Sequence, residues 1–339
     1  MQADRTTGGT CVVDIRGSLS DYNEHRVMEA CVDDIKEIVL DFAGMDFMNA
    51  SSASMLMRLV VLAKKSKRKL RARRLSPHYR DIFRLTGLEG VMRIEPGEAP
   101  AGAARDEGRW ALGIRRLKVP DMPRQARNIN VDGRRAVGPA EGFGQLWQKT
   151  YRLRIDKADV KPADVIRALK ENFPSLQPAH NKFYPSAAGI APGEIVLIDS
   201  STPGGPVSTG VLVLYADDTS FSFMTPQGHP ESGWVTFTAF EEGGRTVVQI
   251  QGLARAGDPL YEAAFRLAGS KMQVRIWTYL LQSLAQHLGV EPEVEVKAEV
   301  LDGRLHCSRA GNIWYNAQVR TLLYVAISPL RRISGRQNR

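Results

Sequence analysis

The stretch GWVTFTAFEEGGRTVVQIQGLARAGDPLYEAAFRLAG (Gly233–Gly269) decides how the C-terminal half of the chain folds. Its first eight residues alternate large apolar side chains with small or polar ones, which is typical of a strand with one buried face. Gly243-Gly244 predicts a turn into a second β-rich run, Arg245–Arg255. Asp258-Pro259 then supplies an N-cap and a first helical residue. The stretch therefore predicts an antiparallel hairpin followed by a helix.

The residues around this stretch continue the pattern. Further β-rich runs precede it, separated by turn residues, and a helix is expected after Pro162. The helix that opens at Asp258-Pro259 is expected to run to near Gly289, because its apolar residues recur three and four positions apart. An antiparallel sheet wrapped around a long helix, an α+β domain, is the expected result. The runs are Tyr151–Asp156, Glu194–Ser200, Gly210–Asp217 and Ser220–Pro226, and the apolar stripe is Val274, Trp277, Leu281, Leu284 and Leu288.

The first part of the chain alternates strand and helix patterns. Cys11–Gly17 and the continuous apolar run Glu37–Phe42 are expected to be strands, the second one buried on both faces. Tyr22–Asp34 is expected to be helical, and another helix should begin at the hydroxyl-rich residues 51–54, which offer N-caps. A basic strand over Lys69–Leu75 and a further helix follow. Strand–helix alternation with short connections predicts an α/β domain.

Residues 97–148 differ in composition from both halves. They are rich in Pro, Gly and Arg and have little periodicity, which is typical of a linker. Trp110, Phe143 and Trp147 lie in this segment, so parts of it are expected to pack on a domain. A connection of about 50 residues is also long for a structureless loop. The expected organisation is a first domain over residues 1–96, a partly ordered linker over 97–148 and a second domain over 149–339.

Composition limits the classes of function. The 339 residues are 43% hydrophobic and include 46 Lys and Arg against 37 Asp and Glu, which predicts a globular protein that favours acidic partners. The three Cys lie far apart, which suits reduced thiols. No apolar secretory segment opens the chain. The longest apolar run near its end, Leu322–Ile327, is far shorter than the roughly 20 residues that span a bilayer. We expect a cytoplasmic protein whose contact with the inner membrane surface, if any, is peripheral.

Two segments of the first domain resemble the STAS domain, the fold of anti-sigma-factor antagonists. They are EIVLDFAGMDFMNASSASMLMRLV (Glu37–Val60) and LSPHYRDIFRLTGLEGVMRI (Leu75–Ile94). The resemblance implies a surface that binds a protein partner and a switch turn that follows a strand-end Asp. The serine that the family phosphorylates falls on Ala50, so the usual switch is absent unless Ser51 substitutes. The switch-turn residues are Asp41, Asn49, Ala50, Ser51 and Ser52.

Residues 150–290 resemble a START-like helix-grip domain of the SRPBCC superfamily, which includes polyketide cyclases and lipid-transfer proteins. The resemblance rests on the order of the elements and on Gly233–Gly269. It implies an apolar pocket between the sheet and the long helix that holds an apolar or amphipathic small molecule. It implies no particular reaction.

Five residues are candidates for the wall of this pocket. His229 and Trp234 flank an expected turn, and Arg255 ends a strand. Tyr261 lies in the first turn of the long helix, near which the mouth of a helix-grip pocket lies. Arg255 would pair with an anionic head-group; the alternative is an ion pair with Asp258, with Trp234 in the core. The candidates are His229, Trp234, Arg255, Tyr261 and Trp277.

The sequence has no pattern typical of a catalytic or metal site. Its six His are scattered, and it contains no HExxH, CxxC or Gly-x-Ser-x-Gly motif. His306 and Cys307 are expected in a strand, where adjacent side chains point to opposite faces. Gly142-Phe143-Gly144 lacks the other parts of a nucleotide-binding loop. We therefore expect no catalytic residue, no metal and no cofactor.

Two basic segments are candidates for contact with an anionic surface. Lys64–Arg74 holds eight cationic residues in eleven; it can equally be a solvated helix end and edge strand, because no aromatic residue interleaves the charges. The tail Asn312–Arg332 is expected to form an amphipathic helix interrupted by Pro329, which either packs on its own domain or docks on a membrane. The anionic-surface candidates are Lys64, Lys65, Lys67, Arg68, Arg331 and Arg332.

These expectations describe a non-enzymatic regulatory or scaffolding protein. Its STAS-like domain would bind a protein partner, and its START-like domain would hold an apolar or amphipathic, lipid-like molecule. One alternative is an enzyme of the polyketide-cyclase kind that uses His229 or Arg255 to polarise a carbonyl. A second alternative is an anionic-surface or nucleic-acid binder acting through Lys64–Arg74, although nucleic acid is not the expected partner. A pocket in which several polar groups converge would favour the enzyme, and a smooth apolar pocket would favour the carrier.

Overall fold

The computed structural model describes residues 2–6, 9–19, 35–97, 104–120, 122–157 and 159–334. Side chains are described in these ranges except at residues 2–6, 268–270 and 329–334. The helix expected over Tyr22–Asp34 lies outside the described residues. Contacts divide the chain into two units, Met1–Gly113 and Ile114–Arg339, which are described separately.

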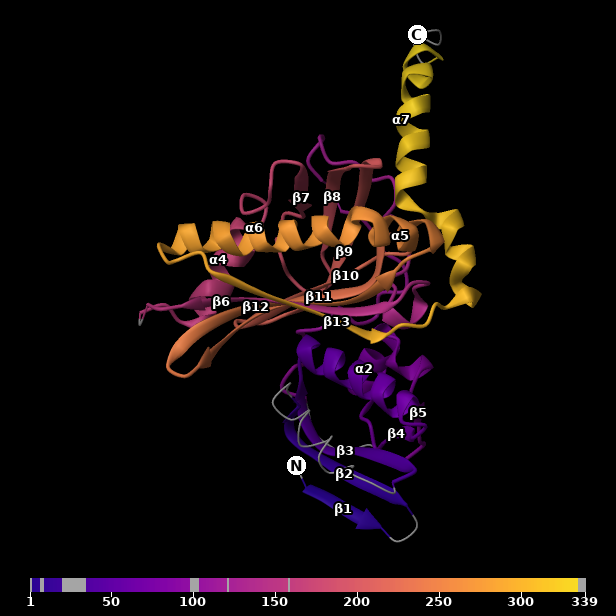
Figure 1. Ribbon diagram of the computed structural model, residues 1–339, viewed down its shortest axis with the longest axis vertical. Helices are drawn as coiled ribbons and strands as arrows, with labels where there is room; N and C mark the ends of the chain where they lie inside the picture. The colour runs from indigo at the N-terminus through magenta and orange to yellow at the C-terminus, as the bar shows by residue number, and fades with distance from the viewer. Residues whose placement is uncertain are drawn as a thin grey trace. The chain divides into compact units, whose positions relative to one another are not determined.

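The N-terminal unit contains a five-stranded sheet with the order β1-β2-β3-β4-β5 (Figure 1). β1 (Gln2–Thr6) runs antiparallel to β2 (Thr10–Leu19), and β2 to β5 run parallel to one another. The other elements are β3 (Glu37–Met48), α2 (Ala50–Lys65), β4 (Lys69–Arg73), α3 (Pro77–Leu85), the 3-10 turn η2 (Leu88–Gly90) and β5 (Arg93–Ile94). This is the α/β arrangement that strand–helix alternation predicts.

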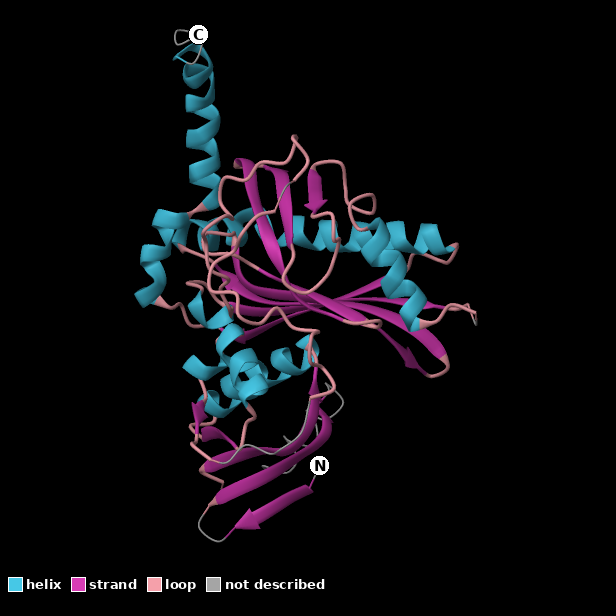
Figure 2. Ribbon diagram, turned by 180° about the vertical axis from the view of Figure 1, so that it is seen from behind, coloured by secondary structure: helices cyan, strands magenta, loops and turns pink. Residues whose placement is uncertain are grey.

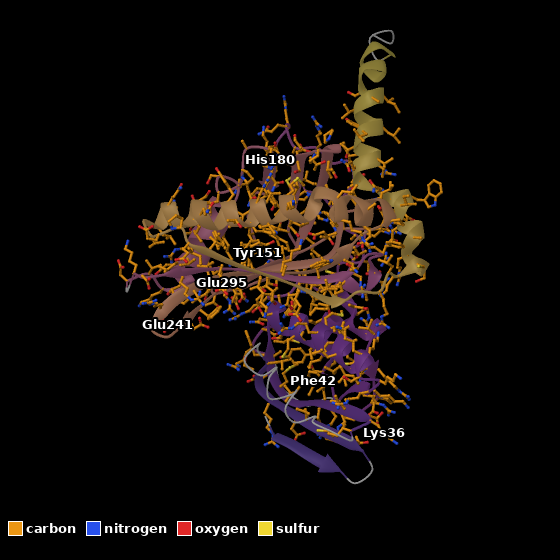
Figure 3. The ribbon with its side chains drawn as sticks, viewed as in Figure 1. Lys36, Phe42, Tyr151, His180, Glu241 and Glu295 are labelled. Atoms are coloured by element: carbon orange, nitrogen blue, oxygen red, sulfur yellow. The ribbon has the colours of Figure 1, made fainter. Side chains whose placement is uncertain are left out.

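The apolar pattern of the strands accounts for the core of this unit. Alternate residues of β2, such as Cys11 and Val13, are fully buried. β3 is buried along Ile38–Phe42, as a continuous apolar run predicts for a central strand. Phe42 packs edge-to-face on Phe83 of α3, with 5.6 Å between the ring centroids (Figure 3). The sheet and α3 therefore share one core.

The segment expected to be a linker, residues 97–148, contributes to both units. In the N-terminal unit, the indole nitrogen of Trp110 donates hydrogen bonds to the Met48 carbonyl at 3.1 Å and to the Asp106 carboxylate at 3.0 Å. From Ile114 onward the chain belongs to the C-terminal unit, where Val131 is fully buried. Apolar side chains thus hold parts of this Pro- and Gly-rich segment in place.

The C-terminal unit contains an eight-stranded antiparallel sheet with the order β13-β6-β12-β11-β10-β9-β8-β7 (Figure 2). The β-rich runs of the sequence correspond to β6 and to β8 through β12. β7 and β13 were not predicted. The strands are β6 (Leu146–Ile155), β7 (Asn181–Pro185), β8 (Ile195–Thr202), β9 (Gly205–Ala216), β10 (Ser220–Met224), β11 (Glu231–Glu242), β12 (Arg245–Ala256) and β13 (Val294–Asp302).

Two helices, α4 (Pro162–Asn172) and α6 (Ser270–Leu288), cover the inner face of this sheet. Leu281 and Leu284 of α6 are buried in the core, and the rest of the predicted stripe packs against it. This confirms the α+β helix-grip arrangement. The long helix is not continuous, however, because α5 (Pro259–Ala264) is followed by a π-helical segment, Phe265–Gly269. Gly269 is a poor helix former, which favours such an irregularity.

Phe173, the residue after α4, lies at the centre of an aromatic cluster. It is fully buried, and its ring makes edge-to-face contacts with four other phenylalanines at centroid distances of 5.2 to 5.9 Å. One side chain thereby joins α4 to β7, β10 and β11. The four partners are Phe183, Phe221, Phe223 and Phe237.

The chain after β13 differs from the expectation. His306-Cys307 do not lie in a strand: Arg304 folds back onto Asp302 with a 2.9 Å hydrogen bond, and a 3-10 helix, η5 (Cys307–Tyr315), follows. The last helix, α7 (Ala317–Ser334), runs through Pro329 without the expected interruption. A proline removes one helical hydrogen bond and need not end a helix.

We predict that Phe173→Ala destabilises the C-terminal unit by about 3–5 kcal/mol, the usual effect of emptying a buried aromatic site. Urea denaturation followed by circular dichroism measures this. Tyr279→Ala is the matched control, because Tyr279 is 46% exposed on α6 and its truncation should cost far less. Equal stability of the two variants would contradict the central place of Phe173.

Candidate functional site

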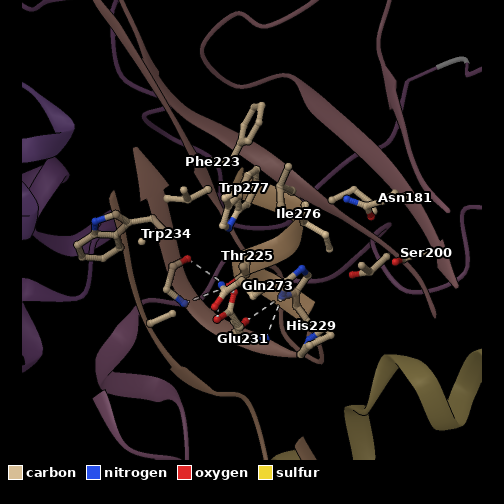
Figure 4. A pocket seen from close by; sticks show the side chains of 18 of the residues that line it. Asn181, Ser200, Phe223, Thr225, His229, Glu231, Trp234, Gln273, Ile276 and Trp277 are labelled. Carbon is tan, nitrogen blue, oxygen red and sulfur yellow. Dashed lines mark hydrogen bonds between the residues drawn. The ribbon is translucent and has the colours of Figure 1, made fainter. Parts of the chain in front are cut away.

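A cavity of about 170 Å³ lies in the C-terminal unit between the sheet and α6 (Figure 4). For comparison, a cavity of roughly 150 Å³ holds benzene, and pockets for drug-sized ligands are about 300–1,000 Å³. In this conformation the cavity therefore has room for a single ring or a short chain. Its wall is mostly apolar, with Phe183, Ile198, Val211, Phe223, Ile276 and Trp277 as the main contributors.

Three polar side chains meet at this cavity. The ammonium of Lys149 on β6 donates a hydrogen bond to the amide oxygen of Gln273 on α6, at 2.5 Å. The amide nitrogen of Gln273 donates to both carboxylate oxygens of Glu231 on β11, at 2.8 Å each. Gln273 therefore bridges a cationic and an anionic side chain and ties α6 to the sheet. We call Lys149, Gln273 and Glu231 the bridged cluster.

Burial opposes the charge at both ends of the bridged cluster. It lowers the pKa of Lys149, which the Glu231 carboxylate raises again in part. It also raises the pKa of Glu231, against the opposite effects of Lys149 and of the hydrogen bond from Gln273. Removing an ion from water costs several kcal/mol, and only a close partner offsets that cost. Each charge is therefore compensated only while the other is present.

His229 presents a neutral imidazole to the same cavity. Its Nδ1 lies 3.0 Å from the backbone nitrogen of Glu231 and 3.1 Å from the Glu231 carbonyl oxygen, so it accepts from the first or donates to the second according to the tautomer. Burial lowers the pKa of His229 from 6.5 to about 4, so the ring is uncharged at neutral pH. The other ring nitrogen, Nε2, can then exchange a hydrogen bond with a ligand.

Besides Oγ1 of Thr278 on α6, two buried hydroxyls have no hydrogen-bond partner among the described residues. One is Oγ1 of Thr209 in the cavity wall; the other is the phenol oxygen of Tyr151, two residues from Lys149 on the same face of β6. An unpaired buried hydroxyl costs about 1–3 kcal/mol. A ligand that bonds Thr209 would remove that cost at the cavity wall. Within the described ranges, no group of three or more His, Cys, Asp or Glu side chains is placed to hold a metal ion.

Three of the five predicted pocket residues border this cavity. The side chains of His229 and Trp277 point toward it (Figure 4). Trp234 borders it as well, but its neighbour Val235 packs on the inner core, so the indole of Trp234 points to the other face of the sheet. Two of the predicted residues thus turn a side chain toward the cavity, and the third is a strand position whose side chain turns away.

Arg255, another predicted pocket residue, lies outside the cavity, and both terminal nitrogens of its guanidinium are engaged elsewhere. Its guanidinium donates to the Asp302 carboxylate at 2.7 Å and to the carbonyls of Gly144 and Arg304 at 2.7 and 2.9 Å. Its ion-pair partner is thus Asp302 and not Asp258. Burial raises the pKa of Asp302, but the hydrogen bonds from Arg304 and Arg255 outweigh it and hold that pKa below its usual range. Arg255 fastens the end of β13 to β12.

Tyr261, the fifth predicted residue, also lies outside the cavity. Its phenol oxygen accepts a hydrogen bond from the backbone N–H of Gln318 at 2.9 Å. Asp258 caps α5 by accepting from the Tyr261 N–H at 3.0 Å, and it accepts from the Asn316 side chain at 2.8 Å. These residues join α5 to the start of α7.

The bridged cluster was missed by the sequence analysis. Lys149 gave a readable signal, since it alternates with Tyr151 and Leu153 on the apolar inner face of β6, where a lysine is out of place. Glu231 begins a strand and resembles an ordinary turn residue. Gln273 precedes the apolar stripe of α6 by one residue, and no local pattern separates it from a surface glutamine.

The predicted switch turn forms the start of α2. Asn49 is the N-cap and accepts a hydrogen bond from the backbone N–H of Ser52 at 3.0 Å. The Ser52 hydroxyl contacts the Leu19 carbonyl and lies 2.9 Å from the Asn49 side-chain oxygen. This reciprocal capping box fixes the turn. Ala50 and Ser51 are the first two residues of the helix.

Asp41, expected at a strand end, lies inside β3 and is an internal ion-pair partner. Its carboxylate accepts hydrogen bonds from Nε of Arg73 at 2.7 Å, from Nε of Arg74 at 2.8 Å and from the Ala43 N–H at 3.1 Å. Burial raises its pKa, but these hydrogen bonds prevail and the pKa lies below the ordinary value. Asp41 therefore connects β3 with the end of β4.

The predicted basic residues lie at two helix ends. Lys64 and Lys65 belong to the last turn of α2, where cations interact favourably with the helix dipole, and Lys67 and Arg68 follow in the next turn. Lys64, Lys65 and Lys67 are exposed. Arg331 and Arg332 lie in α7, and their side chains are outside the described part of the structure.

Residues 3–94 match a family model described as "Mlab, STAS domain". The match coincides with the segment that resembles this family in the sequence and with the α/β sheet of the N-terminal unit. No curated protein matches the chain.

Several solved structures are similar to one unit or the other at low identity. The Bacillus cell fate determinant SpoIIAA, in its phosphorylated form, is 19% identical over 28% of this chain and 90% of its own, with a TM-score of 0.24. The di-domain ARO/CYC StfQ from the steffimycin biosynthetic pathway is 11% identical over 45% of this chain and 54% of its own, with a TM-score of 0.34. Protein Ms6760 from Mycobacterium smegmatis is 12% identical over 51% of this chain and 98% of its own, with a TM-score of 0.32.

We predict that His229 makes the C-terminal unit less stable in acid. The folded state binds the His229 proton with a pKa of about 4, and an unperturbed imidazole binds it at 6.5. Between these values the unfolded chain holds more protons, so this contribution is complete above pH 6.5 and is lost as the pH falls toward 4. Its upper limit is about 3 kcal/mol.

Urea denaturation at several pH values measures this contribution as the difference between the wild type and His229→Asn, which keeps an acceptor near the Nδ1 position. The comparison is needed because Glu231, with its raised pKa, acts in the opposite direction. The exposed His287 supplies the control His287→Asn, which should keep the wild-type pH profile. Identical profiles for His229→Asn and the wild type would show that His229 is not buried in its neutral form.

Proposed function

We propose that this chain, in which residues 3–94 form a STAS domain, is a non-enzymatic regulatory protein that binds a small, mostly apolar molecule and a protein partner. The small molecule would occupy the cavity of the C-terminal unit, and the partner would bind the STAS domain. The observation that carries the proposal is a cavity of about 170 Å³ with an apolar wall and a single bridged cluster of charges.

The bridged cluster defines the chemistry of the ligand. Its two charges compensate each other through Gln273, so an ionic ligand would add a buried charge without a partner. A neutral polar group such as a carbonyl or hydroxyl adds no such charge, and His229 Nε2 and Thr209 Oγ1 are available to bond it. The ligand is therefore an apolar ring or chain that carries a neutral hydrogen-bonding group.

The capping box supports constitutive binding of the protein partner. The Ser52 hydroxyl is engaged at the start of α2, and the position that the resemblance assigns to a phosphorylated serine is Ala50. A turn fixed in this way suits a binding surface that is always available. A reducing, cytoplasmic setting belongs to the same proposal, since the three Cys of the sequence lie far apart with no paired spacing.

Filling the cavity should abolish ligand binding without unfolding the protein. N-phenyl-1-naphthylamine, a neutral apolar fluorophore, serves as the probe. Thr209→Trp places an indole where the Thr209 hydroxyl lacks a partner, and we expect it to weaken probe binding at least tenfold. Thr219→Trp is the matched control, because Thr219 lies in an exposed turn, and it should bind like the wild type. Equal fluorescence titrations for all three proteins, with equal melting temperatures, would place the probe outside the cavity and overturn the proposal.

A second candidate function is an enzyme that acts on a carbonyl group of the ligand. The observation that favours it is the convergence of Lys149, Glu231 and His229 on one cavity, where burial shifts the pKa of each. Glu231, with a raised pKa, would act as the general acid or base, and the His229 N–H would stabilise negative charge on the carbonyl oxygen.

The mass of the compound extracted from protein purified from its own host separates the two candidates. A carrier yields the same compound from the wild type and from Glu231→Gln. An enzyme yields product from the wild type and unconverted substrate, with a different mass, from Glu231→Gln. Glu241→Gln, at the exposed end of β11, is the control and should match the wild type in both cases. We expect one mass throughout.

A further inference from the structure

The first turns of α7 are fastened to the C-terminal unit. Ala317 and Thr321 are fully buried. The side-chain nitrogen of Asn130 donates to the Ala317 carbonyl and to the Thr321 hydroxyl, at 3.1 Å each, and its oxygen accepts from Nε of Arg320 at 3.0 Å. The backbone N–H of Ala317 donates to the Gly228 carbonyl at 2.9 Å. These bonds set the direction in which the helix leaves the unit.

Beyond Thr321 the helix is mostly exposed to solvent, although Leu322 still lies against Gly205 of β9. Leu322–Ile327 are six consecutive exposed residues, and since a helical turn takes about 3.6 residues they cover the whole circumference. Leu323 is 57% exposed and Tyr324 is 45% exposed, and Trp314 just before α7 is 82% exposed. α7 extends away from the sheet of its own unit (Figures 1 and 2). Apolar side chains all around a helix need an apolar environment that the described part of this unit does not supply.

The charge of this segment is of one sign. Residues 303–339 contain seven arginines and no Asp, Glu or Lys, so they carry a charge of +7, against +9 for the whole chain. The arginines are Arg304, Arg309, Arg320, Arg331, Arg332, Arg336 and Arg339. An apolar helix within a cationic segment is complementary to a surface that is apolar inside and anionic outside.

We propose that α7, together with Trp314, docks on the surface of an anionic lipid bilayer. The aliphatic side chains of Leu322–Ile327 enter the boundary between head groups and acyl chains. The aromatic side chains of Trp314 and Tyr324 lie at the head groups, and the arginines contact anionic phosphates. Each arginine near such a surface contributes about 1 kcal/mol. This inference is independent of the ligand in the cavity.

Charge favours a bilayer over a second copy of the chain as the partner of α7. Two α7 helices that paired through Leu322–Ile327 would bring two segments of +7 together, with no acidic residue within residues 303–339 to compensate. An anionic bilayer supplies the missing negative charge.

The helix lies at the bilayer surface and does not cross it. The uncharged run Thr321–Leu330 is about 15 Å long as a helix, half of the roughly 30 Å of a hydrocarbon core. Among the helices that the structure describes, none is long and apolar enough to span a membrane.

Docking of α7 brings the edge of the cavity close to the bilayer. Gly228, which accepts the hydrogen bond from Ala317, directly precedes His229 of the cavity wall. An added Cβ at Gly228 would lie 2.1 Å from the Tyr315 carbonyl oxygen, so only glycine permits this close approach. The turn that carries His229 is therefore packed directly against the base of the docking helix.

Flotation of the full chain with lipid vesicles tests the proposal. The vesicles contain phosphatidylcholine alone or phosphatidylcholine with phosphatidylglycerol. We expect the wild type to float with the phosphatidylglycerol vesicles and to remain unbound with the neutral ones. The double variant Leu323→Gln/Val325→Gln keeps the charge and should weaken binding at least tenfold, since it removes two apolar side chains from the interface. Raising the salt concentration should weaken wild-type binding, because the Debye length shortens.

The matched control is Tyr279→Gln/Val296→Gln, which replaces two similarly exposed apolar residues outside the segment and should float like the wild type. Both double variants change exposed positions, so their melting temperatures and their titrations with N-phenyl-1-naphthylamine should equal those of the wild type. Loss of flotation with an intact titration supports bilayer docking and leaves the cavity proposal untouched.

Two results would overturn the proposal. One is equal flotation of the wild type and Leu323→Gln/Val325→Gln, which would assign any binding to other residues. The other is a wild-type oligomer in analytical ultracentrifugation that Leu323→Gln/Val325→Gln converts to a monomer, with no flotation of either, which would make a second copy the partner of α7.

Discussion

The inner face of the eight-stranded sheet is apolar and has to be covered, and the way in which α4 and α6 cover it determines the rest of the C-terminal unit. The C-terminal half of α6 packs closely, with Leu280, Leu281 and Leu284 fully buried. Its N-terminal half borders the cavity through Gln273, Ile276 and other side chains. The π-helical segment Phe265–Gly269 precedes the part of α6 that borders the cavity, and Phe265 itself lines the cavity. The irregular backbone and the cavity therefore occur at the same place on the sheet.

The bridged cluster adds a polar constraint to this apolar cover. An isolated Lys149 or Glu231 would be costly at a buried site, and Gln273 allows both to remain because it accepts from one and donates to the other. Three elements of the fold, β6, β11 and α6, must keep their positions for these bonds to persist. Because the two charges compensate each other through these bonds, the ligand is expected to be neutral.

Local patterns predicted most of the fold. Alternation identified β10 and β11, a continuous apolar run identified β3, and the stripe from Val274 to Leu288 identified the face of α6 that packs on the sheet. β13 was missed, although Val294–Val300 alternates apolar with charged residues in the same way. The break between α5 and α6 depends on a backbone irregularity that side-chain periodicity does not report.

The site was less predictable than the fold because its residues are distant in the sequence. Lys149, Glu231 and Gln273 meet only when β6, β11 and α6 are assembled, and of the three only Lys149, on the apolar face of β6, differs from an ordinary surface residue. Arg255 shows the opposite error: a cationic residue at a strand end suggests a ligand, yet its partner Asp302 lies 47 positions further along the chain. Spacing in the sequence gave no indication of that pair.

The edge strand β13 has a consequence for the behaviour of the protein at high concentration. An unpaired strand edge is a template for joining another sheet, and long apolar edges lead to filaments. β13 exposes Glu295, Lys297 and Glu299 between its apolar residues, and Glu295 is also held by Arg154 at 2.9 Å (Figure 3). At the opposite edge, β7 ends in Pro185, which lacks the N–H that a neighbouring strand would need. Pairing of two sheets through β13 would take these charges out of water, which is unfavourable. The charged residues therefore disfavour polymerisation of the unit, and their replacement by β-branched residues would favour it.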